Sequence, residues 1–261
     1  MSSTRKILLT FDVEEFDLPL EYNQQISLQE QLVTGYNGLQ RIEDILNSAA
    51  ASTTLFTTAV FAENFPNDIR ELSEKHEIAS HCFSHSTFEE KDLQRSKEKL
   101  ESITGKKITG LRMPRMRKVE PGLVREAGYA YNSSINPTWL PGRYNNLKVP
   151  RLPFKENNLL QFPVSVSPHL RIPLFWLAFK NMPYHLYLRI VLQTLKHDGY
   201  VCLYFHPWEF IDLSVYKIPS YIKKGSKNKL LIKMKRLVAD LSNEGEFVTM
   251  EKYISDNTLT T

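Results

Sequence analysis

The sequence has only two cysteines, Cys82 and Cys202, in a chain of 261 residues. A disulfide-stabilised scaffold uses more cysteines in a much shorter chain, so this class is excluded. Both cysteines lie within apolar runs, where a reduced thiol behaves as a small buried hydrophobic group. We therefore predict two buried, unpaired thiols.

The chain also lacks a long apolar run and a strong charge imbalance. No uninterrupted apolar stretch reaches the roughly 18 residues of a membrane-spanning helix, and no signal-peptide core precedes the first strand pattern. We therefore expect a cytoplasmic protein. The net charge of +4 is too small and too evenly spread to favour nucleic acid. It is compatible with anionic substrates or with peripheral association at a membrane surface, although the aromatic stretches 175–179 and 184–192 are expected to form core or a cleft wall.

Runs of β-forming residues alternate with helical patterns along the whole chain, without an internal repeat, a low-complexity segment or an interior linker. This alternation predicts βα units around a parallel sheet, and the length suits one α/β barrel domain over residues 1–261. A frayed tail is expected after residue 249. The runs that predict strands are 6–11, 52–60, 78–79, 108–112, 129–135, 160–164, 200–205 and 246–249, and the predicted helices are 38–47, 67–75, 88–104, 121–128, 186–197 and 230–242.

Polar side chains recur at the carboxyl ends of the predicted strands. In α/β barrels, this end of the sheet carries the chemistry, because the strand ends and their following loops meet there. We therefore expect these side chains to share one cleft. They are Asp12, Glu14, His81, Arg112 and His206.

His81 and His85 have a spacing that allows both rings to reach one metal ion. The spacing alone is a weak signal, and such a pair is more often structural. Asp12 and Glu14 strengthen it, because one of the two carboxylates can bind the metal while the other accepts a proton from its water. A solvated acidic loop is the alternative, since further acidic residues follow.

Arg112 and His206 complete the expected cleft. Arg112 can pair with a carboxylate and keep it ionised and oriented, with an ordinary surface arginine as the alternative. We predict surface positions for Arg115 and Arg117. His206 ends a buried apolar run, where a core histidine is common, but near a metal-bound substrate it would be the acid for a leaving amine.

With these residues in view, the sequence resembles the polysaccharide deacetylases of the NodB-homology type, carbohydrate esterase family 4. The opening Asp-Val-Glu and the closing His-Pro-Trp-Glu are most similar to the branch associated with exopolysaccharide biosynthesis. The motifs that carry the resemblance occur in matching order at 9–14, 65–66, 76–85, 110–114, 128–137, 162–165 and 203–209.

The resemblance implies a distorted, TIM-barrel-like (β/α) barrel with seven strands. It also implies a metal-dependent hydrolase that removes an N-acetyl group from an amino sugar in a cell-surface polysaccharide or its precursor. The implied cofactor is a divalent ion, Zn²⁺ first, with Co²⁺, Ni²⁺ or Fe²⁺ as alternatives. The implied roles are general base for Asp12, tether of that base for Arg112, general acid for His206, and metal ligands for Glu14, His81 and His85.

One departure from the family pattern bears on the metal. Val13 occupies the place of the usual aspartate ligand, so Glu14 is expected to substitute for it. Two rival functions follow from the same residues. One is a deformylase or cyclic-amide hydrolase with a small cytoplasmic substrate, and the other is an inactive glycan-binding barrel in which Glu14 points away from the histidines. The sugar and the oligomeric state stay open.

Overall fold

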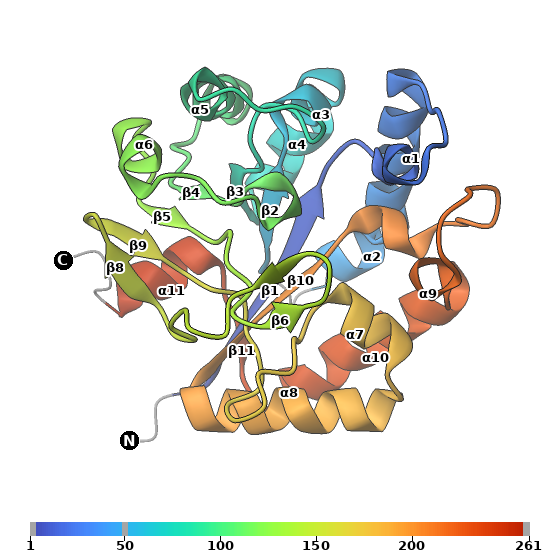
Figure 1. Cartoon of the computed structure of the whole chain (residues 1–261), viewed down its shortest axis with the longest axis vertical. Coiled ribbons are helices and arrows are strands. Elements are labelled where there is room, and N and C mark those ends of the chain that lie inside the picture. Colours follow the sequence, from blue (N-terminus) through green and yellow to red (C-terminus); the bar gives the residue numbers. More distant parts are fainter. Residues whose placement is uncertain (1–3, 49–51, 258–261) are drawn as a thin grey trace.

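The computed structural model describes residues 4–48 and 52–257 and contains one curled, mainly parallel sheet (Figure 1). Its parallel strands confirm the predicted distorted barrel with seven strands. β8 (Phe154–Glu156) adds an antiparallel neighbour to the last of them, and β11 (Glu246–Phe247) pairs with the start of β1. The parallel order is β10 (Tyr200–Phe205), β1 (Lys6–Val13), β2 (Thr54–Thr57), β3 (Glu77–Ser80), β4 (Gly110–Leu111), β5 (Tyr131–Asn132) and β9 (Leu159–Gln161).

The barrel is closed by hydrogen bonds rather than by a strand ladder, as far as residues 4–48 and 52–257 show. Beyond β9, the backbone N–H of Ser165 donates to the carbonyl of Cys202 over 2.9 Å, and the Cys202 N–H donates to Ser165 Oγ over 2.8 Å. Along β1 the side chains alternate between two faces, as strand geometry requires. Leu8 packs into the barrel interior, whereas Leu9 packs against the outer helices.

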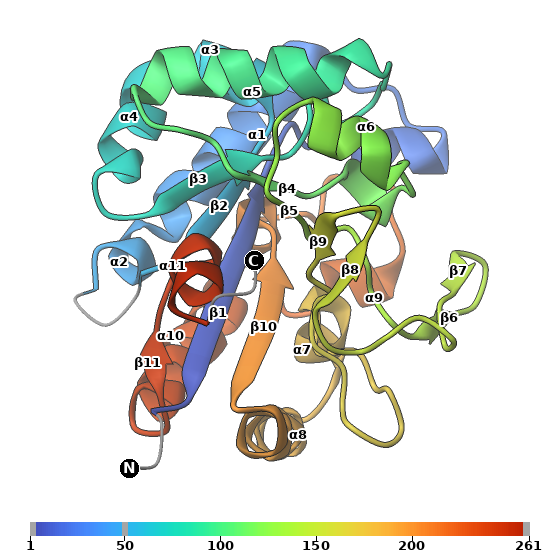
Figure 2. The same ribbon diagram turned by 90° about the vertical axis from the view of Figure 1, so that its left-hand side faces the viewer.

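Helices cover the outside of the sheet (Figures 1 and 2). None of the helices in the described part of the chain is long and apolar enough to cross a membrane. They are α1 (Leu28–Arg41), α2 (Glu43–Leu46), α3 (Ala59–Asn64), α4 (Pro66–Ser73), α5 (Lys91–Thr104), α6 (Pro121–Glu126), α7 (Trp176–Asn181), α8 (Tyr184–Asp198), α9 (Ser220–Lys223), α10 (Asn228–Ser242) and α11 (Met250–Asp256). Short 3₁₀ turns at η1 (Leu18–Tyr22), η2 (Pro114–Met116) and η3 (Pro207–Phe210), and the hairpin of β6 (Trp139–Leu140) and β7 (Tyr144–Asn145), shape one end.

Helix α1 packs closely against two loops, one at Glu14 and one at Pro207. It begins ten residues before the predicted helix at 38–47, with Ser27 Oγ accepting from the N–H of Glu30. A Cβ on Gly35 would lie 2.3 Å from the carbonyl oxygen of Glu14, and one on Gly38 would lie 2.5 Å from the carbonyl carbon of Pro207. Only glycine at these positions lets the helix press this closely on both loops.

The predicted strands and helices are otherwise largely confirmed, with three differences. The strand predicted at 52–60 ends at Thr57, because Ala59 and Val60 belong to α3, and the strand at 129–135 is reduced to β5. Residues 250–256 form α11 rather than a frayed tail, and residues 258–261 of that predicted tail lie outside the described residues. Thr249 Oγ1 accepts from the N–H of Lys252, and the buried Glu77 carboxylate accepts from the N–H of Glu251, so this helix is capped by long-range as well as local contacts. Both cysteines are buried and unpaired, as predicted.

Candidate active site

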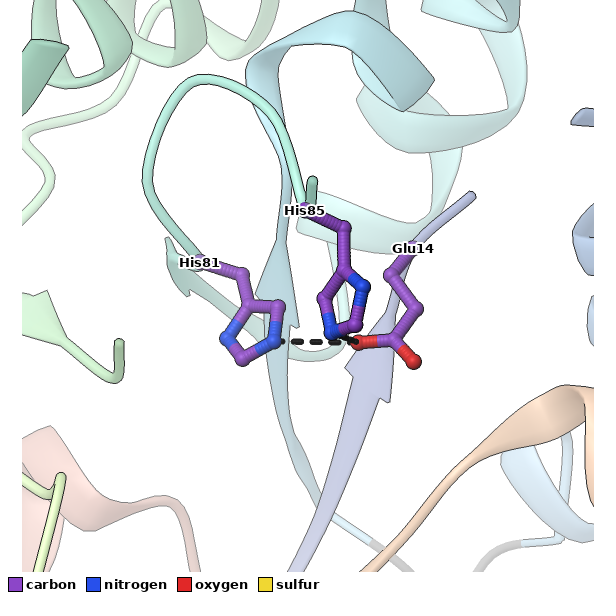
Figure 3. A group of neighbouring side chains, drawn as sticks. All are labelled: Glu14, His81 and His85. Carbon is purple, nitrogen blue, oxygen red and sulfur yellow. Dashed lines mark ion pairs between the residues drawn. The ribbon is translucent and has the colours of Figure 1, made fainter. Parts of the chain in front are cut away.

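Glu14, His81 and His85 converge at the carboxyl end of the sheet (Figure 3). Glu14 follows the last residue of β1, and the two histidines flank the loop after β3. Glu14 Oε2 lies 3.0 Å from His81 Nε2 and 3.1 Å from His85 Nε2. All three side chains are buried. The structure therefore brings together the three residues that the sequence analysis assigned to a metal.

The other nitrogen of each histidine is occupied, which fixes how the rings face Glu14. His81 Nδ1 lies 2.8 Å from the carbonyl oxygen of Arg112. Because a carbonyl only accepts, Nδ1 of His81 donates this hydrogen bond, which leaves Nε2 as the ring atom that faces Glu14. His85 Nδ1 lies 2.7 Å from Asp17 Oδ1, the carboxylate–histidine arrangement that orients ligands in metal sites.

The Glu14 carboxylate has one satisfied oxygen and one unsatisfied oxygen. Its Oε1 accepts from Trp208 Nε1 over 2.9 Å, whereas Oε2 is buried without a well-directed hydrogen-bond donor. Burial would raise the pKa of Glu14, but His85, His206 and His81 outweigh it and hold that pKa well below its usual value. An anionic oxygen between two imidazole nitrogens suits one divalent cation with N₂O ligands, so the residues present fit the metal that the sequence implies.

Asp17 links the His85 ring to an ion-pair chain at the pocket rim. Its Oδ2 accepts from Ser86 Oγ and from Arg115 Nη2, each over 2.7 Å. Arg115 also donates to the His85 carbonyl over 2.9 Å and to Glu21 over 2.6 Å. The prediction of a plain surface position is therefore wrong for Arg115, because its side chain is only 25% exposed and forms ion pairs with Asp17 and Glu21. Arg117 is exposed, as predicted.

The solvated-loop alternative is wrong as well, because Glu15 and Asp17 are both buried. Glu15 accepts from the Thr58 hydroxyl and, over 3.4 Å, from the backbone N–H of His85. Burial raises the pKa of Glu15, whereas Asp17 has a lowered pKa because His85 and Arg115 outweigh its burial. These acidic residues therefore belong to the structure around the histidines.

Asp12 and Arg112 form a buried pair beside the histidines. Arg112 Nη1 donates to Asp12 Oδ1 over 2.7 Å and to Thr10 Oγ1 over 2.8 Å. Its remaining donors reach Ser133, and its guanidinium lies 4.0 Å from the centre of the Phe56 ring. Four hydrogen bonds and the face of the Phe56 ring thus hold this fully buried guanidinium. The prediction that Arg112 pairs with a carboxylate is confirmed.

His206 lies opposite Asp12 and is positioned by its own carboxylate. Its Nε2 is 3.9 Å from Asp12 Oδ2, and its Nδ1 is 3.2 Å from Glu209 Oε1. The same Glu209 oxygen accepts from the His206 backbone N–H over 2.8 Å. The second Glu209 oxygen is 3.5 Å from the buried Lys180 Nζ. Burial opposes the charged form of His206, but Glu14, Glu209 and Asp12 together raise its pKa.

One pocket brings together the proposed metal ligands, Asp12 and His206. Asp12, Glu14, His81, His85 and His206 line it on the polar side. The aromatic stretch 175–179 contributes part of the opposite wall, as expected. The apolar lining consists of Leu18, Met116, Leu140, Phe175, Trp176, Leu177, Tyr204 and Trp208, with Tyr144, Arg115, Arg143, Glu21 and Asp17 completing the wall.

Three residues of this arrangement were missed by the sequence analysis: Asp17, Trp208 and Glu209. Trp208 and Glu209 belong to the His-Pro-Trp-Glu motif, and their position just after a site histidine is a signal that could have identified them. Asp17 lies five residues after Asp12 in the same acidic segment, but nothing in its local pattern distinguishes it from a solvated residue.

Comparison with known proteins supports the resemblance seen in the sequence. Residues 2–131 match the model of the polysaccharide deacetylase family, a match that ends before His206. A search of curated protein sequences found no match. Many solved structures share the fold, and three illustrate the range of their names.

A protein from Mycobacterium smegmatis assigned to the polysaccharide deacetylases is 18% identical, with a TM-score of 0.66 over 98% of this chain and 91% of that one. Puue allantoinase is 14% identical, with a TM-score of 0.63 over 97% and 90%. A carbohydrate esterase family 4 pseudoenzyme from Bacillus anthracis is 11% identical, with a TM-score of 0.53 over 97% and 66%. At such identities the similarity concerns the fold. The family match and these folds together support a polysaccharide deacetylase domain of the NodB-homology type in this chain.

Proposed function

We propose that the protein is a metal-dependent hydrolase that removes the N-acetyl group of an amino sugar in a cell-surface polysaccharide or its precursor. One observation carries this proposal. Three metal-ligand atoms, a carboxylate held by a buried arginine, and a histidine held by a second carboxylate all face the same pocket. The resemblance to the exopolysaccharide-associated branch supports the substrate class, and a cytoplasmic location is part of the proposal.

Glu14, His81 and His85 would hold the ion, with Zn²⁺ favoured by the N₂O ligand set and Co²⁺, Ni²⁺ or Fe²⁺ as alternatives. The ion would supply Lewis-acid activation of the acetyl carbonyl and of a water molecule. Asp17 and the Arg112 carbonyl hold the two rings by their Nδ1 atoms, so the Nε2 atoms stay directed at this point.

Asp12 and His206 would handle the protons. Arg112 occupies Asp12 Oδ1, so Oδ2 is the atom left to accept the proton of the attacking water. His206 Nδ1 is held by Glu209, which leaves Nε2 as the atom that donates to the departing amine nitrogen. Asp12 Oδ2 and His206 Nε2 lie 3.9 Å apart, so the proposed base and acid would act next to one another.

The apolar wall would position the sugar. Trp176 and Trp208 pack with ring centres 5.5 Å apart, and the His206 ring stacks on Trp208 at 4.7 Å. Aromatic faces suit both the acetyl methyl group and the C–H face of a pyranose ring. The ring of Trp176 also lies 5.2 Å from that of His206, so two indole rings limit the directions in which the imidazole can move.

The geometry weighs against the inactive glycan-binding alternative. That alternative expects Glu14 to point away from the histidines, but its Oε2 lies between them. The alternative of a deformylase or cyclic-amide hydrolase uses the same metal and proton groups, so it becomes an outcome of the test below.

The test combines metal analysis with product analysis. Protein reconstituted with Zn²⁺, Co²⁺, Ni²⁺ or Fe²⁺ is expected to hold one ion per chain and to release acetate from N-acetylated oligosaccharides. His81→Ala should lose the ion, His206→Ala should keep the ion and lose turnover, and the exposed control His185→Ala should retain both. Release of formate or opening of a ureide without acetate release would favour the small-substrate alternative, and failure of the metal-replete protein to hold an ion would overturn the proposal.

A further inference from the structure

One short segment, residues 211–229, contains the entire net charge of the protein. It has five of the 33 basic residues and one of the 29 acidic residues, so the remaining chain has 28 of each sign. The expectation that the charge is evenly spread is therefore wrong. The charged residues of the segment are Asp212, Lys217, Lys223, Lys224, Lys227 and Lys229.

Three of these lysines are free to contact a partner. Lys227 pairs with Asp212 over 2.5 Å, and Lys223 donates to the carbonyl of Tyr216 over 3.0 Å. The other three are exposed, and none forms an ion pair with a residue in the described part of the chain. These three are Lys217, Lys224 and Lys229.

Exposed apolar side chains lie between these lysines. Val215 is 74% exposed and Tyr221 is 49% exposed. The loop that bears Val215 connects η3 to α9 and projects from the edge of the molecule (Figure 1). Single exposed apolar residues are ordinary, but cationic side chains interleaved with apolar ones are typical of segments that lie in a membrane interface.

The inner side of the segment packs against the pocket wall. Leu213, Tyr216, Ile218 and Ile222 form a buried cluster with Phe16 and Trp208, and Trp176 and Leu177 pack on this cluster. Trp176, Leu177 and Trp208 line the catalytic pocket. The charged segment thus forms the outside of the wall whose inside faces the substrate.

We propose that residues 211–229 are a docking surface for an anionic lipid bilayer, oriented so that the mouth of the pocket lies next to the membrane. The lysines provide attraction to anionic headgroups, and Val215 and Tyr221 enter the boundary between headgroups and acyl chains. Given the proposed function, this orientation suits an N-acetylated sugar that is attached to a lipid. A soluble polyanion would use the lysines but would gain little from the apolar side chains.

Vesicle co-sedimentation tests the surface without requiring hydrolysis. The wild-type chain is expected to bind vesicles that contain phosphatidylglycerol as well as phosphatidylcholine, and to bind vesicles of phosphatidylcholine alone only weakly. Added salt should release the protein from the anionic vesicles. Each lysine near an anionic surface strengthens membrane partitioning about fivefold. The triple variant Lys217→Glu/Lys224→Glu/Lys229→Glu should therefore lower the partition coefficient by at least on the order of 100-fold. The control Lys107→Glu/Arg125→Glu/Lys196→Glu changes the net charge equally and should retain binding.

A second variant separates a bilayer from a soluble polyanion. Val215→Ser/Tyr221→Ser leaves the charge unchanged and should weaken vesicle binding several-fold while leaving heparin binding unchanged. Equal binding to both kinds of vesicle, an equal loss in the control, or insensitivity to Val215→Ser/Tyr221→Ser would overturn the proposal. Deacetylation of a water-soluble substrate should be unchanged in all three variants, so failure of docking and failure of the proposed activity are distinguishable.

Discussion

Asp12 and Glu14 are two carboxylates at the same end of β1, separated by one residue, yet they meet opposite environments. Asp12 faces a guanidinium that the protein itself supplies, with Arg112 Nη1 at 2.7 Å. Glu14 faces two imidazole nitrogens and an indole N–H, and one of its oxygens lacks a well-directed donor. The strand gives both side chains the same direction, so the difference comes from the neighbouring strands.

This difference shows how the same chemical group acquires two roles. A guanidinium stays charged at every accessible pH, so Asp12 is already paired and has no capacity for a second full cation. Arg112 holds it in place, and its second oxygen faces His206. Glu14 is equally buried, but the groups that face its Oε2 are the imidazoles of His81 and His85, which bind a metal ion in their neutral form. Glu14 can therefore accept a metal ion as its cation.

The largest effect is expected from a variant in which Glu14 can no longer serve as a metal ligand. Glu14→Gln takes the negative charge from the centre of the two histidines while keeping the size of the side chain. Metal affinity should fall by more than the about 10–100-fold typical of losing a partner outside the ligand sphere. Calorimetric titration of the metal-free protein with Zn²⁺ measures this loss. Wild-type affinity in Glu14→Gln would show that the histidines recruit a different third ligand.

The next effect should fall on turnover alone. Asp12→Asn keeps the hydrogen bond from Arg112 but removes the proton acceptor, so kcat should fall by about 10²–10⁴-fold. Zn²⁺ affinity should remain within a few-fold of the wild type, because Asp12 does not belong to the ligand group. The two measurements are made on the same preparation. Loss of metal with Asp12→Asn, and its retention with Glu14→Gln, would reverse the two assignments.

The positions of these carboxylates were predictable from the sequence because a parallel sheet brings its strand ends together. Asp12, His81 and His206 follow three apolar runs, and β1, β3 and β10 deliver them to the same pocket. Knowledge of the sheet order was not needed for this prediction. Any parallel arrangement of these runs places the residues after them at one edge.

The residues that hold the ligands could not be predicted in this way. Arg115 reaches Asp17 across 98 positions of the sequence, from a turn in which Arg115 and Met116 both have positive φ. Local pattern gives no signal for such a turn in residues other than glycine or asparagine. Helix α11 was missed for a similar reason, because one of its two capping groups, the Glu77 carboxylate, comes from β3.

A smaller effect on metal binding is expected from a change at Asp17, which holds the ring of His85. Asp17→Asn removes the charge from the carboxylate on His85 Nδ1, so Zn²⁺ affinity should fall by about 10–100-fold with Arg112 and Asp12 unaffected. Glu15→Gln is the matched control, since Glu15 is also buried but contacts the His85 backbone rather than its ring. Affinity in the control should stay within a few-fold of the wild type. An equal loss of Zn²⁺ affinity in both variants would mean that Asp17 and Glu15 only maintain the local structure, and that the contact with the His85 ring has no special role.

The smallest expected effect concerns the protonation of His206, the histidine that lies opposite Asp12. Glu209 is one of the groups that raise the pKa of His206, so Glu209→Gln should lower that pKa. A general acid works only while protonated, so the fall of kcat at high pH should begin at a lower pH than in the wild type. Lys180→Met removes the buried cation next to Glu209 and keeps the carboxylate, so it should move the same limb to higher pH. Shifts in the same direction, measured in pH profiles of kcat with metal-saturated protein, would exclude Glu209 as the group that sets the proton affinity of His206.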